Sequence, residues 1–262
     1  SIGHDTNLNQ GLDEDGLPFY YGDQELVDGN FAQIGARFHY SNPMSSGYVG
    51  YLKAAGQHRI YDDADNTNIT DLALTAGVTK SDGDTSYNYS ASIRPLWLDG
   101  DHNRTLYHLD AGVSKNIDEQ HDFRLGAQWG YFDEDDDLAD RQRLLLSAGI
   151  SRKSLSVSHQ VMTYVGTEWS DDSAGEYNAR DIYGISYRLT HISAASNSKT
   201  FAQIYYQREN HKEVHPAYEF WPYSGEAQKD DLVGVTLGHD RTIATDTVLF
   251  ARYSYQNNSS NI

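Results

Sequence analysis

Residues 122–132 read DFRLGAQWGYF, and this stretch decides the fold. The odd positions from 123 to 131 are all apolar or aromatic, whereas the even positions from 124 to 130 are Arg, Gly, Gln and Gly. A period of two residues is typical of a β-strand, whose side chains point alternately to opposite faces. The stretch therefore predicts a strand with one apolar face and one polar face.

The same alternation recurs along the whole chain, most clearly at 31–40 and 182–190. Strands of about ten residues, tilted by about 45°, would span the ~25 Å apolar band of an outer membrane. The alternation predicts twelve complete strands, at 31–40, 48–57, 71–79, 87–97, 105–114, 122–132, 143–151, 155–165, 182–191, 200–208, 231–239 and 247–256.

The predicted connections alternate between short and long, as the periplasmic turns and external loops of bacterial barrels do. Short connections are predicted at 41–47, 80–86, 116–121, 152–154, 193–199 and 240–246. The connections on the opposite side are longer and acidic, except for the short one at 98–104. Loop 9–30, for example, holds six carboxylates and no Lys or Arg, namely Asp13, Glu14, Asp15, Asp23, Glu25 and Asp28. This rhythm predicts an acidic external rim.

The two ends of the chain resemble cut strands. Residues 1–8 would be the upper part of a truncated first strand, and residues 257–262 have no returning partner. An unpaired strand edge in lipid is costly, and single-chain bacterial barrels have even strand numbers. We therefore predict an all-β fold, an antiparallel transmembrane β-barrel of 14 strands with about 12 complete, as one domain over 1–262. A large soluble β-sandwich is the alternative fold.

Composition excludes several classes of protein. Hydrophobic residues make up 38% of the chain, and no apolar run approaches the ~18 residues of a membrane-spanning helix, so helical membrane proteins are excluded. The net charge of −18 argues against nucleic acid as a partner. The predicted location is the outer membrane, with its lipid and lipopolysaccharide as partners.

The polar face of each predicted strand would line the barrel interior, as a channel wall or as a salt-bridged filling. The lumen-facing candidates are Gln33, Arg37, His39, Arg94, Asp110, Arg124, Gln128, Arg188 and Arg252. Seven aromatic residues of the opposite face would form the girdles at the membrane interfaces, namely Tyr40, Trp97, Tyr107, Trp129, Tyr131, Tyr183 and Tyr187.

Three constellations contain residue types that could carry chemistry, and none predicts a site. His211 and His215 have zinc-like spacing but lack the Glu that follows the first His of zinc proteases, so a polar loop is the simpler interpretation. The acidic run 133–137 lacks the spacing of an EF-hand. His159 falls on the face opposite Ser156 and Ser158, which argues against a lipase-like site. We predict no catalytic, metal or cofactor site, and a protein that is not an enzyme.

At the amino end, residues 3–9 read GHDTNLN. This segment resembles the Gly-Tyr-Asp-Ser-Asn-Val/Ile-Asn segment that opens the barrel of the surface lipoprotein assembly modifier family, from which His4 and Thr6 depart. The resemblance implies a fourteen-stranded barrel preceded by a periplasmic tetratricopeptide domain, and that helical repeat domain is absent from this sequence. It also implies a conduit that delivers a client, a lipoprotein or related secreted protein, to the cell surface.

Three functions follow as hypotheses. The first is translocation or surface display of lipoproteins or related secreted proteins. The second is a polysaccharide-export or passive diffusion channel, and the third is an outer-membrane enzyme. Large steady single-channel conductance would count against the first hypothesis, and convergence of Ser, His and a carboxylate near the outer rim would favour the third.

Overall fold

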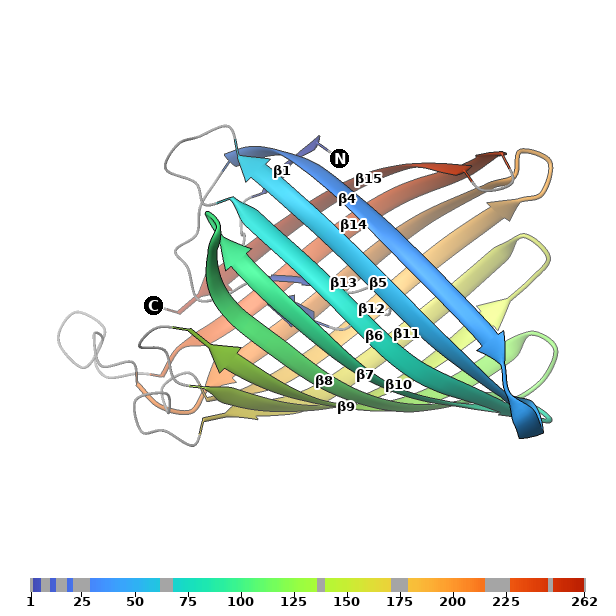
Figure 1. Ribbon diagram of the computed structural model, residues 1–262, viewed down its shortest axis with the longest axis horizontal. Coiled ribbons are helices and arrows are strands. Elements are labelled where there is room, and N and C mark those ends of the chain that lie inside the picture. The colour runs from blue at the N-terminus through green and yellow to red at the C-terminus, as the bar shows by residue number, and fades with distance from the viewer. Residues whose placement is uncertain are drawn as a thin grey trace.

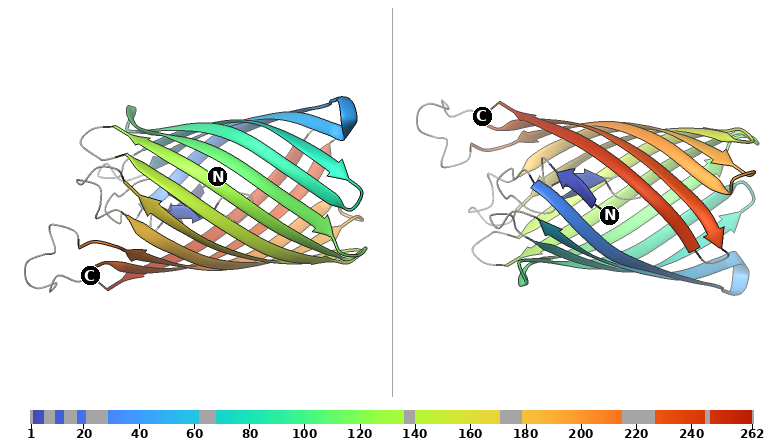
Figure 2. Two further views of the ribbon diagram at one scale, coloured as in Figure 1. Left: turned by 90° about the horizontal axis from the view of Figure 1, so that it is seen from below. Right: turned by 90° about the horizontal axis from the view of Figure 1, so that it is seen from above.

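The structure, a computed structural model, describes residues 2–5, 10–12, 18–20, 29–61, 68–135, 140–170, 179–214, 227–244 and 247–261. Within these ranges an antiparallel sheet of 13 strands curls into a barrel (Figures 1 and 2). Its strands, in order around the sheet, are β1 (Ile2–Asp5), β4 (Gly29–Pro43), β5 (Tyr48–Tyr61), β6 (Ile69–Asp82), β7 (Thr85–Leu98), β8 (Asp101–Asn116), β9 (His121–Glu134), β10 (Arg141–Lys153), β11 (Val157–Trp169), β12 (Arg180–Ser193), β13 (Ser198–His211), β14 (Lys229–Ala244) and β15 (Thr247–Ser260).

The short strand β1 pairs with β4 and also contacts β15, so it lies at the seam of the barrel. Two further short strands, β2 (Gln10–Leu12) and β3 (Pro18–Tyr20), pair with each other and lie between the barrel walls in both views of Figure 2. The sequence pattern predicted an external acidic loop for that stretch. Its six carboxylates fall outside the described residues.

The predicted all-β barrel is confirmed, and each of the twelve predicted strands matches one of β4–β15. The observed strands are longer than predicted, with 13 to 16 residues each. β14 continues to Ala244, and β15 includes residues 257–260, which the sequence pattern placed in an unpaired end. The reason is that backbone pairing continues above and below the apolar band, where the side-chain alternation has already ended. The total of 14 strands stays a prediction.

The connections divide the barrel into two ends. The short-turn end, at the right of Figure 1, carries the connections at residues 44–47, 83–84, 117–120, 154–156, 194–197 and 245–246. The long-loop end carries those at 62–68, 135–140, 170–179 and 212–228, together with the two-residue turn Asp99-Gly100. Both turn residues have positive φ, 50° and 92°, as a type I′ hairpin turn requires. The predicted rhythm of short and long connections is confirmed.

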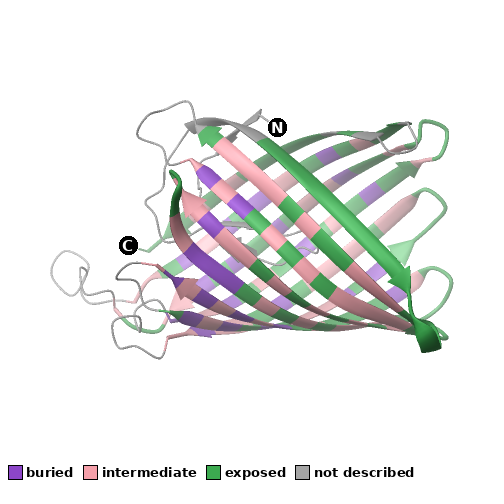
Figure 3. Ribbon diagram, in the orientation of Figure 1, coloured by how far each residue is buried: buried purple, intermediate pink, exposed green. Residues whose placement is uncertain are grey.

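The single-layered wall has one apolar face and one polar face. Along β10, the side chains of Leu144, Leu146 and Ile150 are exposed on the outside, whereas Arg141 and Arg143 are buried on the inside. Exposed apolar side chains around a barrel form the surface that meets lipid. Buried residues gather instead near the long-loop end, as Figure 3 shows. No helix in the described part of the chain is long and apolar enough to cross a membrane.

Candidate functional site in the barrel lumen

The inner face of the barrel is the candidate functional site, because a solute or client that passes through a barrel meets this face. The predicted lumen residues whose side chains the structure describes all lie on the inner side of their strands, namely Arg37, His39, Arg94, Asp110, Arg124, Gln128, Arg188 and Arg252. The side chain of Gln33 lies outside the described residues.

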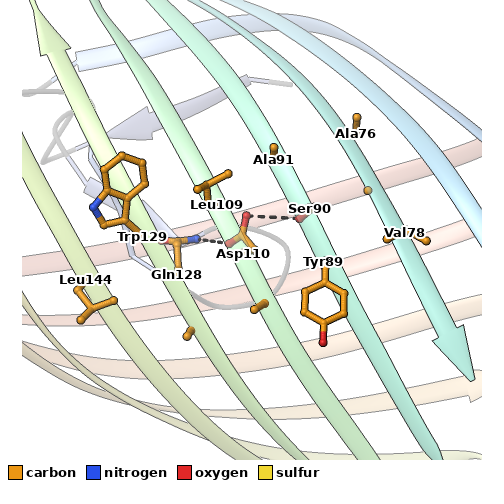
Figure 4. A pocket seen from close by; sticks show the side chains of 13 residues that line it. Ala76, Val78, Tyr89, Ser90, Ala91, Leu109, Asp110, Gln128, Trp129 and Leu144 are labelled. Atoms are coloured by element: carbon orange, nitrogen blue, oxygen red, sulfur yellow. Dashed lines mark hydrogen bonds between the residues drawn. The ribbon is translucent and has the colours of Figure 1, made fainter. Parts of the chain in front are cut away.

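Several of these residues are joined to inner-face neighbours on adjacent strands. Arg94 binds Asp71 through two hydrogen bonds, and the bond from Nε to Oδ1 is 2.7 Å long. Asp110 accepts hydrogen bonds from Ser90 at 3.4 Å and from Gln128 Nε2 at 2.9 Å, which Figure 4 shows as dashed lines. These cross-strand bonds hold the polar wall in one arrangement.

Near the short-turn end, two arginines flank an aromatic ring. The guanidinium carbons of Arg188 and Arg252 lie 4.0 and 4.7 Å from the ring centre of Phe201, which is a cation–π geometry. Arg252 Nη1 also donates a 2.8 Å hydrogen bond to Asp240. Both members of that ion pair remain partly open to solvent, at 37% and 23% exposure.

Other basic side chains lie on the inner face near this end. Arg124 Nε and Lys153 Nζ both bind Asp122, at 3.2 and 2.6 Å. The His39 ring meets the ring of Tyr51 edge-on, with centroids 6.3 Å apart. We use the name basic group for the partly exposed cations of this end that are described above, namely Arg124, Lys153, Arg188 and Arg252.

A row of ion pairs crosses the inner face at the long-loop end. We name it the charged belt; its members are Arg104, Glu134, Arg141, Glu168, Arg180 and Glu209. Successive charged atoms lie 2.6 to 3.7 Å apart, and the signs alternate from β8 to β13. The Glu168 carboxylate, 0% exposed, lies between Arg141 and Arg180. Buried charges persist when they are paired in this way.

Sequence reasoning missed the charged belt. All six residues fall in connections predicted at 98–104, 133–142, 166–181 and 209–230, because the apolar alternation that defined the strands ends before the backbone ladder does. The available signal was a charged residue close to the long-loop end of six successive strands, with the sign changing from strand to strand. Once the strand bounds are known, the alternation of side chains shows that each of these charged residues points into the barrel.

Arginines of the belt region surround Phe132. The guanidinium carbons of Arg104, Arg141 and Arg143 lie 5.7, 5.3 and 5.1 Å from its ring centre. Arg143 Nη2 also donates to Gln128 Oε1 at 3.3 Å. Cation–π contacts gain strength where water is excluded, so Phe132 helps to hold these guanidiniums in a dry setting.

Between the charged belt and the short-turn end, the rings of inner-face tyrosines lie against glycines of the neighbouring strand. A Cβ built on each such glycine would come within 1.9 to 2.3 Å of the ring, so only glycine fits beneath it. The phenol groups donate hydrogen bonds of 2.7 to 2.9 Å to side-chain oxygens of further strands. The three sets, each given as tyrosine, glycine and acceptor, are Tyr51, Gly77 and Asn88; Tyr164, Gly184 and Gln207; Tyr205, Gly234 and Gln256.

The outer face carries the aromatic residues predicted for the girdles. Tyr40, Tyr107, Tyr183 and Tyr187 are exposed there. Trp129 borders an apolar groove of about 670 Å³, whose floor includes alanines of β6 to β9 (Figure 4). These residues would meet lipid, in agreement with the predicted structural role.

The three constellations of the sequence have different outcomes. His159 lies on the outer face, where its Nδ1 is 2.8 Å from the Tyr187 hydroxyl, and Ser158 lies on the inner side. In the acidic run 133–137, Glu134 is a member of the charged belt, and residues 136–137 lie outside the described ranges. His211 is described and lies beside Asp230, whereas His215 is outside the described ranges.

Comparisons with known proteins concern the fold. No protein-family model and no curated protein matches the chain. Among solved structures, the chain is similar to OmpTdeltaL8, a loop L8 deletion mutant of OmpT, an outer membrane protein of Vibrio cholerae, with 10% identity, a TM-score of 0.47, and coverage of 87% of this chain and 93% of that one. A second similar structure, from work on the in-meso crystallization of membrane proteins, has 13% identity, a TM-score of 0.36, and coverage of 88% and 83%.

The chain is an outer-membrane β-barrel protein, as its antiparallel barrel with an apolar outer face and a polar inner face requires. The predicted outer-membrane location is confirmed. The prediction that the protein is not an enzyme does not stand. That exclusion rested on missing sequence motifs, and a barrel fold leaves room for catalysis at its loop end.

Proposed function

We propose that the barrel is a conduit that delivers lipoproteins or related secreted proteins to the cell surface. The observation that carries the proposal is a middle zone of the lumen wall in which small neutral residues are frequent beside Asp110 and Gln128. The small residues on the inner face that no tyrosine ring covers include Thr75, Ser90, Ser92, Gly112, Gly126, Ser147, Gly149, Ser186 and Thr236. Conduction requires that the wall bind the passing molecule weakly enough to release it. A wall of this kind suits an extended polypeptide of varied sequence.

The position of the interior tyrosines favours a protein client over a polysaccharide. A sugar-conducting lumen should offer ordered aromatic faces to its solute. Tyr164 and Tyr205 are instead 3% and 6% exposed, Tyr51 is half-buried, and the hydroxyl of each is bonded to a side chain of the wall. The resemblance of residues 3–9 to the lipoprotein assembly modifier segment supports the same choice.

Surface labelling tests the proposal even while the client is unidentified. A strain that lacks the gene encoding this chain is compared with its parent after labelling with a membrane-impermeant biotin reagent. We expect one or a few lipoproteins to lose surface label while their total abundance stays constant, and expression of the gene should restore the label. Unchanged labelling of every surface protein would refute the proposal.

A passive pore is the second candidate, and the basic group favours it. The partly exposed Arg124 and Arg252 would attract small anions into the short-turn end of the lumen. Planar bilayers separate the two functions. A large, steady, anion-selective conductance, reduced in selectivity by Arg124→Gln and Arg252→Gln, would indicate the pore, whereas a conduit for proteins should be closed in the absence of a client.

A further inference from the structure

Where the charged belt ends on β13, three side chains of metal-binding type from β13 and β14 converge on the inner face. Glu209 and His211 are two residues apart on β13, so they share a face, and Asp230 lies directly across from Glu209 on β14. One ligand atom from each residue lies within 4.8 Å of the other two. We propose that Glu209, His211 and Asp230 bind a divalent transition-metal cation of the Zn²⁺ class.

The local charge favours a cation at this position. Glu209 and Asp230 are paired across the strands, and like charges placed directly opposite each other are destabilising. Arg180 Nη1 contacts Glu209 Oε2 at 3.0 Å but is shared with Glu168, and His211 Nε2 lies 3.5 Å from Asp230 Oδ2. The signs alternate elsewhere along the belt, so this junction of two carboxylates is where a bound cation relieves repulsion.

Neighbouring groups hold the three side chains in place. Gln207 Nε2 donates to Glu209 Oε1 at 2.5 Å, and Gln228 Nε2 donates to both oxygens of Asp230 at 3.0 and 2.9 Å. The backbone N–H of His211 donates to the carbonyl of Gln228 at 2.9 Å, so Gln228 connects two of the three ligands. Outer-shell partners of this kind orient ligands and raise metal affinity.

The donor set selects the class of metal. One imidazole nitrogen and two carboxylate oxygens suit Zn²⁺, whereas Ca²⁺ and Mg²⁺ prefer oxygen-only sets with more ligands. Zn–N and Zn–O bonds of about 2.0–2.2 Å place neighbouring ligand atoms roughly 3.5 Å apart, so small side-chain rotations would close the cluster. Three protein ligands leave a fourth position for water.

Calorimetric titration of the whole chain, refolded in detergent, with Zn²⁺ tests the site. We expect one Zn²⁺ per chain that a 100-fold excess of Mg²⁺ or Ca²⁺ fails to displace. Because loss of an outer-shell partner alone weakens metal binding by about 10- to 100-fold, His211→Gln and Asp230→Asn should each weaken it by about 100-fold or more. Gln228→Leu should weaken it by about 10- to 100-fold.

His159→Gln is the matched control, because His159 is a strand histidine on the outer face, bonded to Tyr187. It should bind Zn²⁺ as the parent does. Retention of the folded barrel in each variant is checked by circular dichroism and by heat-modifiable migration on gels. Absence of stoichiometric Zn²⁺ binding to the parent chain would overturn the proposal, as would binding that His211→Gln and Asp230→Asn leave unchanged.

Discussion

The two ends of the lumen hold their charges in opposite ways. In the charged belt, each of Glu134 and Glu168 is almost completely buried between two guanidiniums. In the basic group, the ion pair between Arg252 and Asp240 remains partly open to water. Burial makes an ion pair costly to break, whereas solvent makes it weak. The belt should therefore stabilise one geometry of the long-loop end, while the basic group remains available to a passing solute or client.

The largest expected effect is the difference in stability loss between two variants, each of which removes one carboxylate charge from one end of the lumen. Glu168→Gln leaves Arg141 and Arg180 buried without their shared carboxylate, and we expect a loss of about 3–5 kcal/mol in the free energy of unfolding. Asp240→Asn, its matched control, removes the partner of Arg252 in the basic group and should lose at most about 1 kcal/mol. Urea unfolding in detergent measures both. Equal losses would show that the two ends do not differ in this way.

The next effect concerns the two faces of the wall at mid-height. Leu146 is exposed on the outer face of β10, and Ser147, the next residue, lies on the inner face. An Arg that faces lipid near the midplane costs about 2–4 kcal/mol, so Leu146→Arg should destabilise the barrel by that amount in liposomes. Ser147→Arg enters the polar lumen and should have little effect on stability. A reversed order would mean that the faces are assigned the wrong way round.

A smaller effect is expected where Tyr164 covers Gly184. A Cβ on Gly184 would lie 1.9 Å from the ring, so Gly184→Ala must displace Tyr164 and its bond to Gln207. Overpacking of this kind costs about 1–3 kcal/mol. The control is Gly112→Ala, because the nearest atom to a Cβ there is 3.6 Å away. Thermal unfolding in detergent should separate the variants, and equal melting temperatures would argue against a fixed tyrosine.

The smallest expected effect lies in the exposed turn between β8 and β9. A hydrogen bond from the backbone N–H of Gln120, with others from His121, lowers the pKa of the Asp118 carboxyl below its ordinary value of 3.8. The stability from these bonds is therefore present above the unfolded-state pKa and lost as the pH falls through the folded-state pKa. NMR titration of the Asp118 carboxyl should give a pKa below 3.8, and His121→Ala should raise it. A pKa at or above 3.8 in the parent chain would contradict this assignment.

Sequence reasoning predicted the wall of the barrel well, because lipid on one side and water on the other impose a period of two on every strand. Residues 122–132 are sufficient to assign both faces of β9. The same reasoning did not predict the ends of the strands, where both faces are polar and backbone hydrogen bonding continues without an alternation of side chains. Glu168 and Arg180 were placed in a loop for that reason.

The sequence predicted which side chains of the candidate site face the lumen, but not which residues they bind. Arg94 and Asp110 were assigned to the lumen by alternation alone, yet their partners Asp71 and Ser90 depend on the register between strands. Register is set by turn lengths and bulges, such as the irregularity between Leu96 and Trp97, and single-strand patterns do not contain it. The convergence of Glu209, His211 and Asp230 was missed for the same reason.

The most direct test of the account is a cysteine scan along β9, since the chain contains no native Cys. Single cysteines at positions 123–131 would carry a spin label in liposomes, and relaxation by oxygen would be compared with relaxation by a water-soluble nickel chelate. We predict that odd positions respond to oxygen, as lipid-facing sites do, and that even positions respond to the nickel chelate, as a water-filled lumen requires. A response without a period of two, or nickel accessibility at positions 125, 127 and 129, would contradict a barrel with this inner face.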